Sequence, residues 1–190
     1  MSFAILDDYQ GLRTAIAEAA QDGILMLAST HDEGLNQHKA YPANYPEPFC
    51  ITACDEYGTL PQNPPAKYDY RLHGTNIPAG VIPFLVSDDR ISGSSVATAI
   101  AAGLSSLTIS CDRLCSPGKV YSPKTIMRKD LIERRFNFMV SSNPTSPDDE
   151  KYVILEKFAD FSSKTKDGER VDIRKIIGEA FGDRSGHTSG

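Results

Sequence analysis

Residues 92–111, SGSSVATAIAAGLSSLTISC, are the most informative stretch of this sequence. Ala, Ser, Gly and medium aliphatic residues dominate it, so it predicts a thin helix that can pass deep between other layers of a fold. The helix begins directly after Gly93, and the first turn of a helix carries free backbone N–H groups. Those groups and the helix dipole can bind a developing oxyanion, so Ser95 is placed both to attack a carbonyl and to help hold its oxygen. A plain helix-capping serine is the alternative explanation of the same pattern.

The segments before this helix alternate between helix and strand patterns. Residues 9–22 carry apolar side chains at helical spacing, and Gly23 follows as a stop signal. Residues 23–29 (GILMLAS) and 49–55 (FCITACD) are short continuous apolar runs, which are typical of parallel strands buried on both faces. Residues 79–86 (AGVIPFLV) are expected to be extended. The alternation predicts an α/β fold.

The sequence changes in character from about residue 116. Residues 122–136 begin Ser-Pro and predict a helix, as do residues 146–161, which also place three acids in the first turn. Residues 171–182 are a last amphipathic stretch. We therefore predict one domain over residues 1–115 and a helical C-terminal extension with a disordered tail over residues 116–190.

Two blocks of the sequence resemble the subtilisin-like serine peptidases, or subtilases. Residues 93–97, Gly-Ser-Ser-Val-Ala, are similar to the subtilase nucleophile motif Gly-Thr-Ser-x-Ala, with Ser in place of Thr. Residues 29–34, Ser-Thr-His-Asp-Glu-Gly, follow a predicted helix and strand, where subtilases carry an oxyanion-hole Asn. Asp32 occupies the position of that Asn. Residues 1–4 resemble the end of a strand that forms one wall of the pocket for the substrate's first side chain.

The resemblance implies the second half of a three-layer α/β sandwich with a mostly parallel central sheet. It also implies a serine endopeptidase that acts by acyl transfer on a peptide or protein substrate and requires no cofactor. Ser95 would be the nucleophile, and Asp32 would face the oxyanion together with the Ser95 N–H. The residues that would flank the substrate pocket are Ser2, Phe3, Ala4, Ser29, Thr30, His31 and Glu33.

The other two members of the subtilase triad have no match in this sequence. In that family the triad runs Asp, His, Ser along the chain, and the first two lie upstream of the strand that corresponds to Met1. His73-Gly74-Thr75 looks like the family's His motif but comes after the oxyanion block, so we reject it. The chain alone is therefore expected to be inactive. The alternative function is a non-catalytic pseudo-peptidase module that binds peptides or a partner protein.

The composition and net charge of the chain bear on its partners, its metal binding and its location. A net charge of −5 and a pI of about 5.4 argue against nucleic acid as a partner. The sequence shows no signal peptide and no apolar run that approaches the ~20 residues of a membrane-spanning helix. The four cysteines fall in two Cys-x-x-x-Cys pairs, which we interpret as buried free thiols rather than metal ligands. Together these features predict a cytoplasmic protein without a membrane partner.

Overall fold

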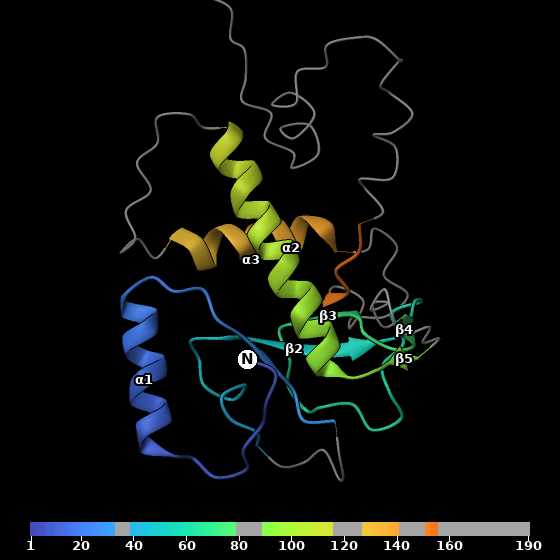
Figure 1. Ribbon diagram of the computed structural model, residues 1–190, viewed down its shortest axis with the longest axis horizontal. Coiled ribbons are helices and arrows are strands. Elements are labelled where there is room, and N and C mark those ends of the chain that lie inside the picture. Colours follow the sequence, from blue (N-terminus) through green and yellow to red (C-terminus); the bar gives the residue numbers. More distant parts are fainter. Residues whose placement is uncertain (33–38, 79–88, 116–126, 141–150, 156–190) are drawn as a thin grey trace, which may run out of the picture.

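The computed structural model describes residues 1–32, 39–78, 89–115, 127–140 and 151–155 (Figure 1). Its helices are α1 (Gln10–Gln21), α2 (Ser94–Cys115) and α3 (Met127–Met139). Its strands are β1 (Leu27–Ser29), β2 (Phe49–Cys54), β3 (Tyr70–His73), β4 (Ile77–Pro78) and β5 (Arg90–Ile91). The predicted strand at residues 79–86 lies outside the described residues.

The first three strands form a parallel sheet in the order β1-β2-β3. Leu27 pairs with Phe49, and Ile51 pairs with Tyr70. All six residues of β2 are buried, which explains why its sequence is a continuous apolar run rather than an alternating one. These parallel strands and the helices around them confirm the predicted α/β class. Strands β4 and β5 form a separate antiparallel pair.

The hydrophobic core lies between this sheet and two helices. Figure 1 shows α2 passing over the sheet and α3 crossing behind α2. Ala97 and Ala101 of α2 are fully buried in one cluster with Ile51 of β2 and with Ile132 and Phe136 of α3. The described part of the predicted C-terminal extension therefore shares its core with the sheet. The domain boundary after residue 115 stays a prediction.

Residues 152–155 are not helical, contrary to the helix predicted over residues 146–161. Tyr152 forms a parallel bridge with Arg71 of β3, and Val153 forms an antiparallel bridge with Val140. The Val153 N–H donates a hydrogen bond to the Arg71 carbonyl oxygen over 3.0 Å. In the described sheet β3 has a strand partner on one side only, so the backbone groups of its other edge need partners. Pairing with that edge, together with burial of Val153, outweighs the local preference for a helix.

The expectation that no apolar run approaches the length of a membrane-spanning helix is wrong for α2. By length and composition alone, residues 94–114 could cross a membrane, and one third of that segment is buried in this fold. The buried hydroxyls of Ser105 and Thr108 donate to the carbonyl oxygens four residues earlier, over 2.8 Å each. These local bonds allow polar side chains on the buried face of an apolar helix. The core position of its first half fits a helix packed inside a protein.

The described cysteines are free thiols. Cys50 and Cys54 are buried in β2, and Cys111 is half-buried in α2. Burial raises the pKa of the Cys50 and Cys54 thiols to about 12 each, so both are neutral at physiological pH.

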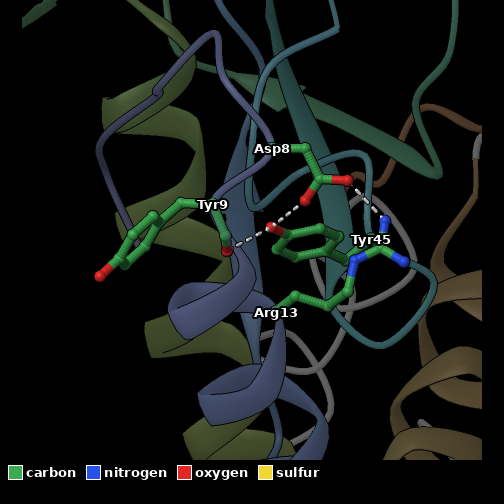
Figure 2. A network of polar contacts seen from close by, with 4 residues as sticks. All are labelled: Asp8, Tyr9, Arg13 and Tyr45. Atoms are coloured by element: carbon green, nitrogen blue, oxygen red, sulfur yellow. Dashed lines mark hydrogen bonds and ion pairs between the residues drawn. The ribbon is translucent and has the colours of Figure 1, made fainter.

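A polar cluster, shown in Figure 2, joins the start of α1 to the turn that contains Tyr45. The Tyr45 hydroxyl donates to one oxygen of Asp8 over 2.9 Å, and the Arg13 guanidinium lies 2.6 Å from the other. The Arg13 guanidinium carbon also lies 5.4 Å from the centre of the Tyr45 ring. The hydrogen bond from Tyr45, with a further contribution from Arg13, holds the pKa of Asp8 below its ordinary value.

Replacing Asp8 with Asn should lower the free energy of unfolding at neutral pH and should have little effect near pH 2. The folded-state pKa of Asp8 lies below its unfolded value of about 3.9. The contribution of Asp8 is therefore present above that value and is lost as the pH falls through the folded-state pKa. Urea denaturation of both proteins from pH 2 to pH 7 measures the difference. Asp7→Asn removes a neighbouring carboxylate outside this cluster and is the control. An Asp8→Asn effect of equal size at both ends of the range would contradict the linkage.

Candidate active site

Two glycines allow α2 to start where it does. Gly93 has φ of 137°, in a region that other residues rarely adopt. Its N–H donates to the Gly74 carbonyl oxygen over 2.8 Å, which fastens the end of β3 to the start of α2. A Cβ atom on Gly74 would lie 2.8 Å from the Cβ of Ala97 and 3.0 Å from the Gly93 carbonyl oxygen. The start of α2 can approach β3 this closely only because residue 74 has no side chain.

The first residue of α2, Ser94, is completely buried and its hydroxyl is a centre of hydrogen bonds. The Ser94 Oγ accepts a bond from the Thr30 hydroxyl over 2.7 Å and another from the Ala53 N–H over 3.1 Å. The same hydroxyl donates to Oδ1 of Asp32, and the Ser94 N–H donates to Oδ2 of Asp32 over 2.5 Å. One hydroxyl thus connects the ends of β1 and β2 to the start of α2.

These bonds fix the role of the Asp32 carboxyl group. A backbone N–H can only donate, so Oδ2 of Asp32 is an acceptor. The Ser94 hydroxyl already accepts from Thr30 and Ala53, and its single proton points to Oδ1. In these contacts Asp32 accepts at both oxygens, Oδ2 from the Ser94 N–H and Oδ1 from the Ser94 hydroxyl. Asp32 and the start of α2 meet at the carboxyl edge of the parallel sheet, as predicted.

Ser95 is exposed at the second position of α2. No described residue makes a hydrogen bond to its side chain, while its carbonyl oxygen accepts one from the Ser2 hydroxyl over 3.4 Å. The carboxylate of Asp32 contacts Ser94 and not Ser95. Sequence reasoning singled out Ser95 and missed Ser94, although Ser94 stands where the subtilase motif has another hydroxyl residue, Thr.

The remaining predicted site residues are partly brought together. The Ser29 N–H donates to the Met1 carbonyl oxygen over 3.0 Å, which places residues 1 and 2 beside β1. Ser29 and Thr30 are buried, Ala4 and His31 are half-buried, and Phe3 is exposed. Glu33 lies outside the described residues. The rejected His73 has its Nε2 atom 2.9 Å from the Thr75 carbonyl oxygen in its own turn.

A hollow of about 70 Å³ opens beside the residues that precede Asp32. It is lined by Thr30, His31, Lys39, Ala40, Ala43, Asn44, Cys50, Pro65, Ala66 and Lys67. Within the described part of the chain, no group of three His, Cys, Asp or Glu side chains could hold a metal ion.

Solved structures with a similar fold are protease and macrocyclase domains. The prenylagaramide maturation protease PagA matches with a TM-score of 0.61 and 22% identity, over 81% of this chain and 57% of that one. The patellamide maturation protease PatA matches with a TM-score of 0.60 and 18% identity, over 80% and 57%. The PatG macrocyclase domain gives a TM-score of 0.62 and 16% identity, over 81% and 48%.

Neither family models nor curated protein sequences match this chain. The structural matches show that the chain has the predicted subtilisin-like fold, and that it spans about half the length of the structures it matches.

Ser94→Ala should reduce the free energy of unfolding by about 1–3 kcal/mol, because the buried Thr30 hydroxyl and Ala53 N–H lose their shared acceptor. Ser95→Ala is the matched control, since it makes the same change at the next, exposed position and should stay within about 0.5 kcal/mol of the wild type. Urea denaturation at neutral pH measures both. Equal losses in the two variants would contradict the structural role of Ser94.

Proposed function

We propose that this chain carries the nucleophile-bearing part of a serine-type endopeptidase site, in which Ser95 attacks a peptide carbonyl. The observation that carries the proposal is the exposed Ser95 hydroxyl on the first turn of α2, at the carboxyl edge of a subtilisin-like sheet. The protease domains of PagA and PatA support the reaction class, because they share this fold.

The proposed chemistry is acyl transfer. The Ser95 oxygen adds to the carbonyl carbon while its proton passes to a general base, and the carbonyl oxygen gains negative charge. The C–N bond then breaks, the leaving amine takes a proton, and the acyl group stays on Ser95 until water hydrolyses the ester. No described group accepts a hydrogen bond from the Ser95 N–H, so this N–H can stabilise the oxyanion from the helix terminus. None of these steps requires a cofactor.

The general base is the missing part of the proposed site. No described histidine contacts the Ser95 hydroxyl, and a serine hydroxyl without a base is a poor nucleophile at neutral pH. We therefore infer that the chain alone does not turn over, and that another segment must supply the base and its orienting acid. The same observation favours the second candidate, a non-catalytic module that binds peptides or proteins at this edge. A cytoplasmic location without nucleic-acid or membrane partners remains a prediction from sequence.

Binding of a peptide boronic acid tests the proposal without requiring turnover. Boron accepts the serine oxygen and forms a tetrahedral adduct that resembles the transition state. Acetyl-Ala-Ala-Pro-Ala-boronic acid should give a tetrahedral ¹¹B signal with the wild-type chain, and Ser95→Ala should weaken binding at least about tenfold. Ser106→Ala, an exposed serine further along α2, is the matched control. Binding with a tetrahedral signal that survives Ser95→Ala would reject Ser95 as the nucleophile. Binding to both proteins without that signal would favour the non-catalytic module.

The negative charge of Asp32 should weaken binding of the boronic acid, because the tetrahedral adduct on Ser95 is also negatively charged. Asp32→Asn would replace a carboxylate with an amide that can donate to the tetrahedral oxygen, so it should tighten boronate binding by up to about a hundredfold. Asp32→Ala removes the charge without adding a donor and should give a smaller gain. Isothermal titration calorimetry measures both affinities, with thermal unfolding as a check on the fold. If neither variant changes the affinity, Asp32 does not face the reacting oxygen.

A further inference from the structure

Asp32 is exposed, yet a single residue holds both oxygens of its carboxyl group. Oδ2 accepts a hydrogen bond from the Ser94 N–H over 2.5 Å, and Oδ1 accepts one from the Ser94 hydroxyl. An exposed Asp side chain otherwise moves among several rotamers, and fixing it in one of them costs conformational entropy. The position of this carboxyl group therefore depends on where the Ser94 hydroxyl points its single proton.

The Thr30 hydroxyl sets the direction of that proton. A serine hydroxyl has one proton to donate and two lone pairs to accept with. The Ala53 N–H bonds to one lone pair of the Ser94 oxygen over 3.1 Å, and the buried Thr30 hydroxyl bonds to the other over 2.7 Å. Because Thr30 donates in this bond, the Ser94 proton cannot point to Thr30 and points to Asp32 instead.

A second acceptor for the Ser94 proton lies nearby. The Thr52 hydroxyl oxygen, buried in β2, is 3.5 Å from the Ser94 oxygen. Without a donor at Thr30, the Ser94 hydroxyl could rotate toward Thr52 and still keep a partner for its buried proton. The Thr30 N–H donates to the Ile51 carbonyl oxygen over 2.9 Å, so the backbone that carries the Thr30 hydroxyl is itself fixed to β2.

We propose that Thr30 is a positioning residue, which holds the Asp32 carboxyl group at the start of α2 by directing the Ser94 proton to it. The consequence for the reaction rests on the proposed function, because the carboxyl group is then kept near the oxyanion that forms on Ser95. Loss of the Thr30 hydroxyl would loosen the carboxyl group and let it turn to solvent, away from that oxyanion.

Amide hydrogen exchange of the ¹⁵N-labelled full chain tests this role without any ligand. Thr30→Val deletes the hydroxyl and keeps a branched side chain. It should speed exchange of the Ser94 amide at least about twofold, because the Asp32 acceptor is held less firmly. In the Asp32→Ala background, where that acceptor is absent, Thr30→Val should leave the rate of the Ser94 amide unchanged. Equal acceleration in both backgrounds would overturn the proposal.

Thr98→Val is the matched control, because it deletes a buried hydroxyl that donates to the Ser94 carbonyl oxygen, over 2.7 Å, and not to the Ser94 hydroxyl. Its effect on the Ser94 amide should be the same with and without Asp32, and a dependence on Asp32 as large as that of Thr30→Val would overturn the proposal. Thr30→Ser keeps the donor and should exchange like the wild type. If Thr30→Ser exchanges as fast as Thr30→Val, the hydroxyl is not what matters. The amide of Ile51 in the core serves as the reference for any general loss of stability.

Binding of acetyl-Ala-Ala-Pro-Ala-boronic acid connects this role to the proposed function. Thr30→Val should tighten binding at least about twofold, since a loosened Asp32 can move away from the negative adduct, and it should change nothing in the Asp32→Ala background. If the adduct forms on Ser95 but neither its affinity nor the Ser94 exchange rate depends on Thr30 as expected, the proposed function stands and this inference is wrong. If no variant forms the adduct while the exchange rates behave as expected, the proposed function fails and the positioning of Asp32 by Thr30 stands.

Discussion

The buried hydroxyl of Ser94 sets the position of α2 on the sheet. It bonds to Thr30 after β1, to Ala53 at the end of β2 and to Asp32, residues that are 41 to 64 positions away from it in the sequence. Without the Ser94 hydroxyl oxygen, the buried Thr30 hydroxyl and Ala53 N–H would lose their hydrogen-bond acceptor. The free energy lost would be a large part of the stability of one domain. Successive residues of a helix point about 100° apart. Because Ser94 points inward, Ser95 is directed outward to solvent.

The same constraint explains where the chain uses its smallest residues. Ser94 can reach Ala53 only if the first turn of α2 lies close to the strand ends, and that closeness excludes a side chain at Gly74. A side chain at Gly93 would also be crowded, since a Cβ atom there would lie 3.1 Å from the carboxylate of Asp32. Ala97 and Ala101 continue the narrow face of α2 across the sheet. The composition that marks residues 92–111 in the sequence is therefore a consequence of tight packing as much as of chemistry.

Much of this arrangement could be predicted from sequence, and the rest depended on contacts between distant residues. The apolar runs at β1 and β2 and the Gly-Ser-Ser motif predicted the parallel strands, the long helix and the meeting of Asp32 with the start of α2. The hydrogen bond from the Ala53 N–H to the Ser94 hydroxyl could not be predicted, because a serine that caps a helix and one that bonds to a sheet have the same local pattern. Tyr152 and Val153 bond to β3 for a similar reason: the strand edge that they meet is distant in sequence.

The carboxylate of Asp32 at this edge of the sheet would disfavour a reaction that forms an oxyanion on Ser95. The carboxylate of Asp32 occupies two donors at the start of α2, the Ser94 N–H and hydroxyl, which places a negative charge near any oxyanion formed on Ser95. The helix terminus supplies positive potential at the same end of the sheet. A neutral transition state gains little from either charge, whereas an anionic one is repelled by Asp32 and attracted by the helix terminus. Coulombic energy falls with distance, so the outcome depends on whether the reacting oxygen lies closer to Asp32 or to the Ser95 N–H.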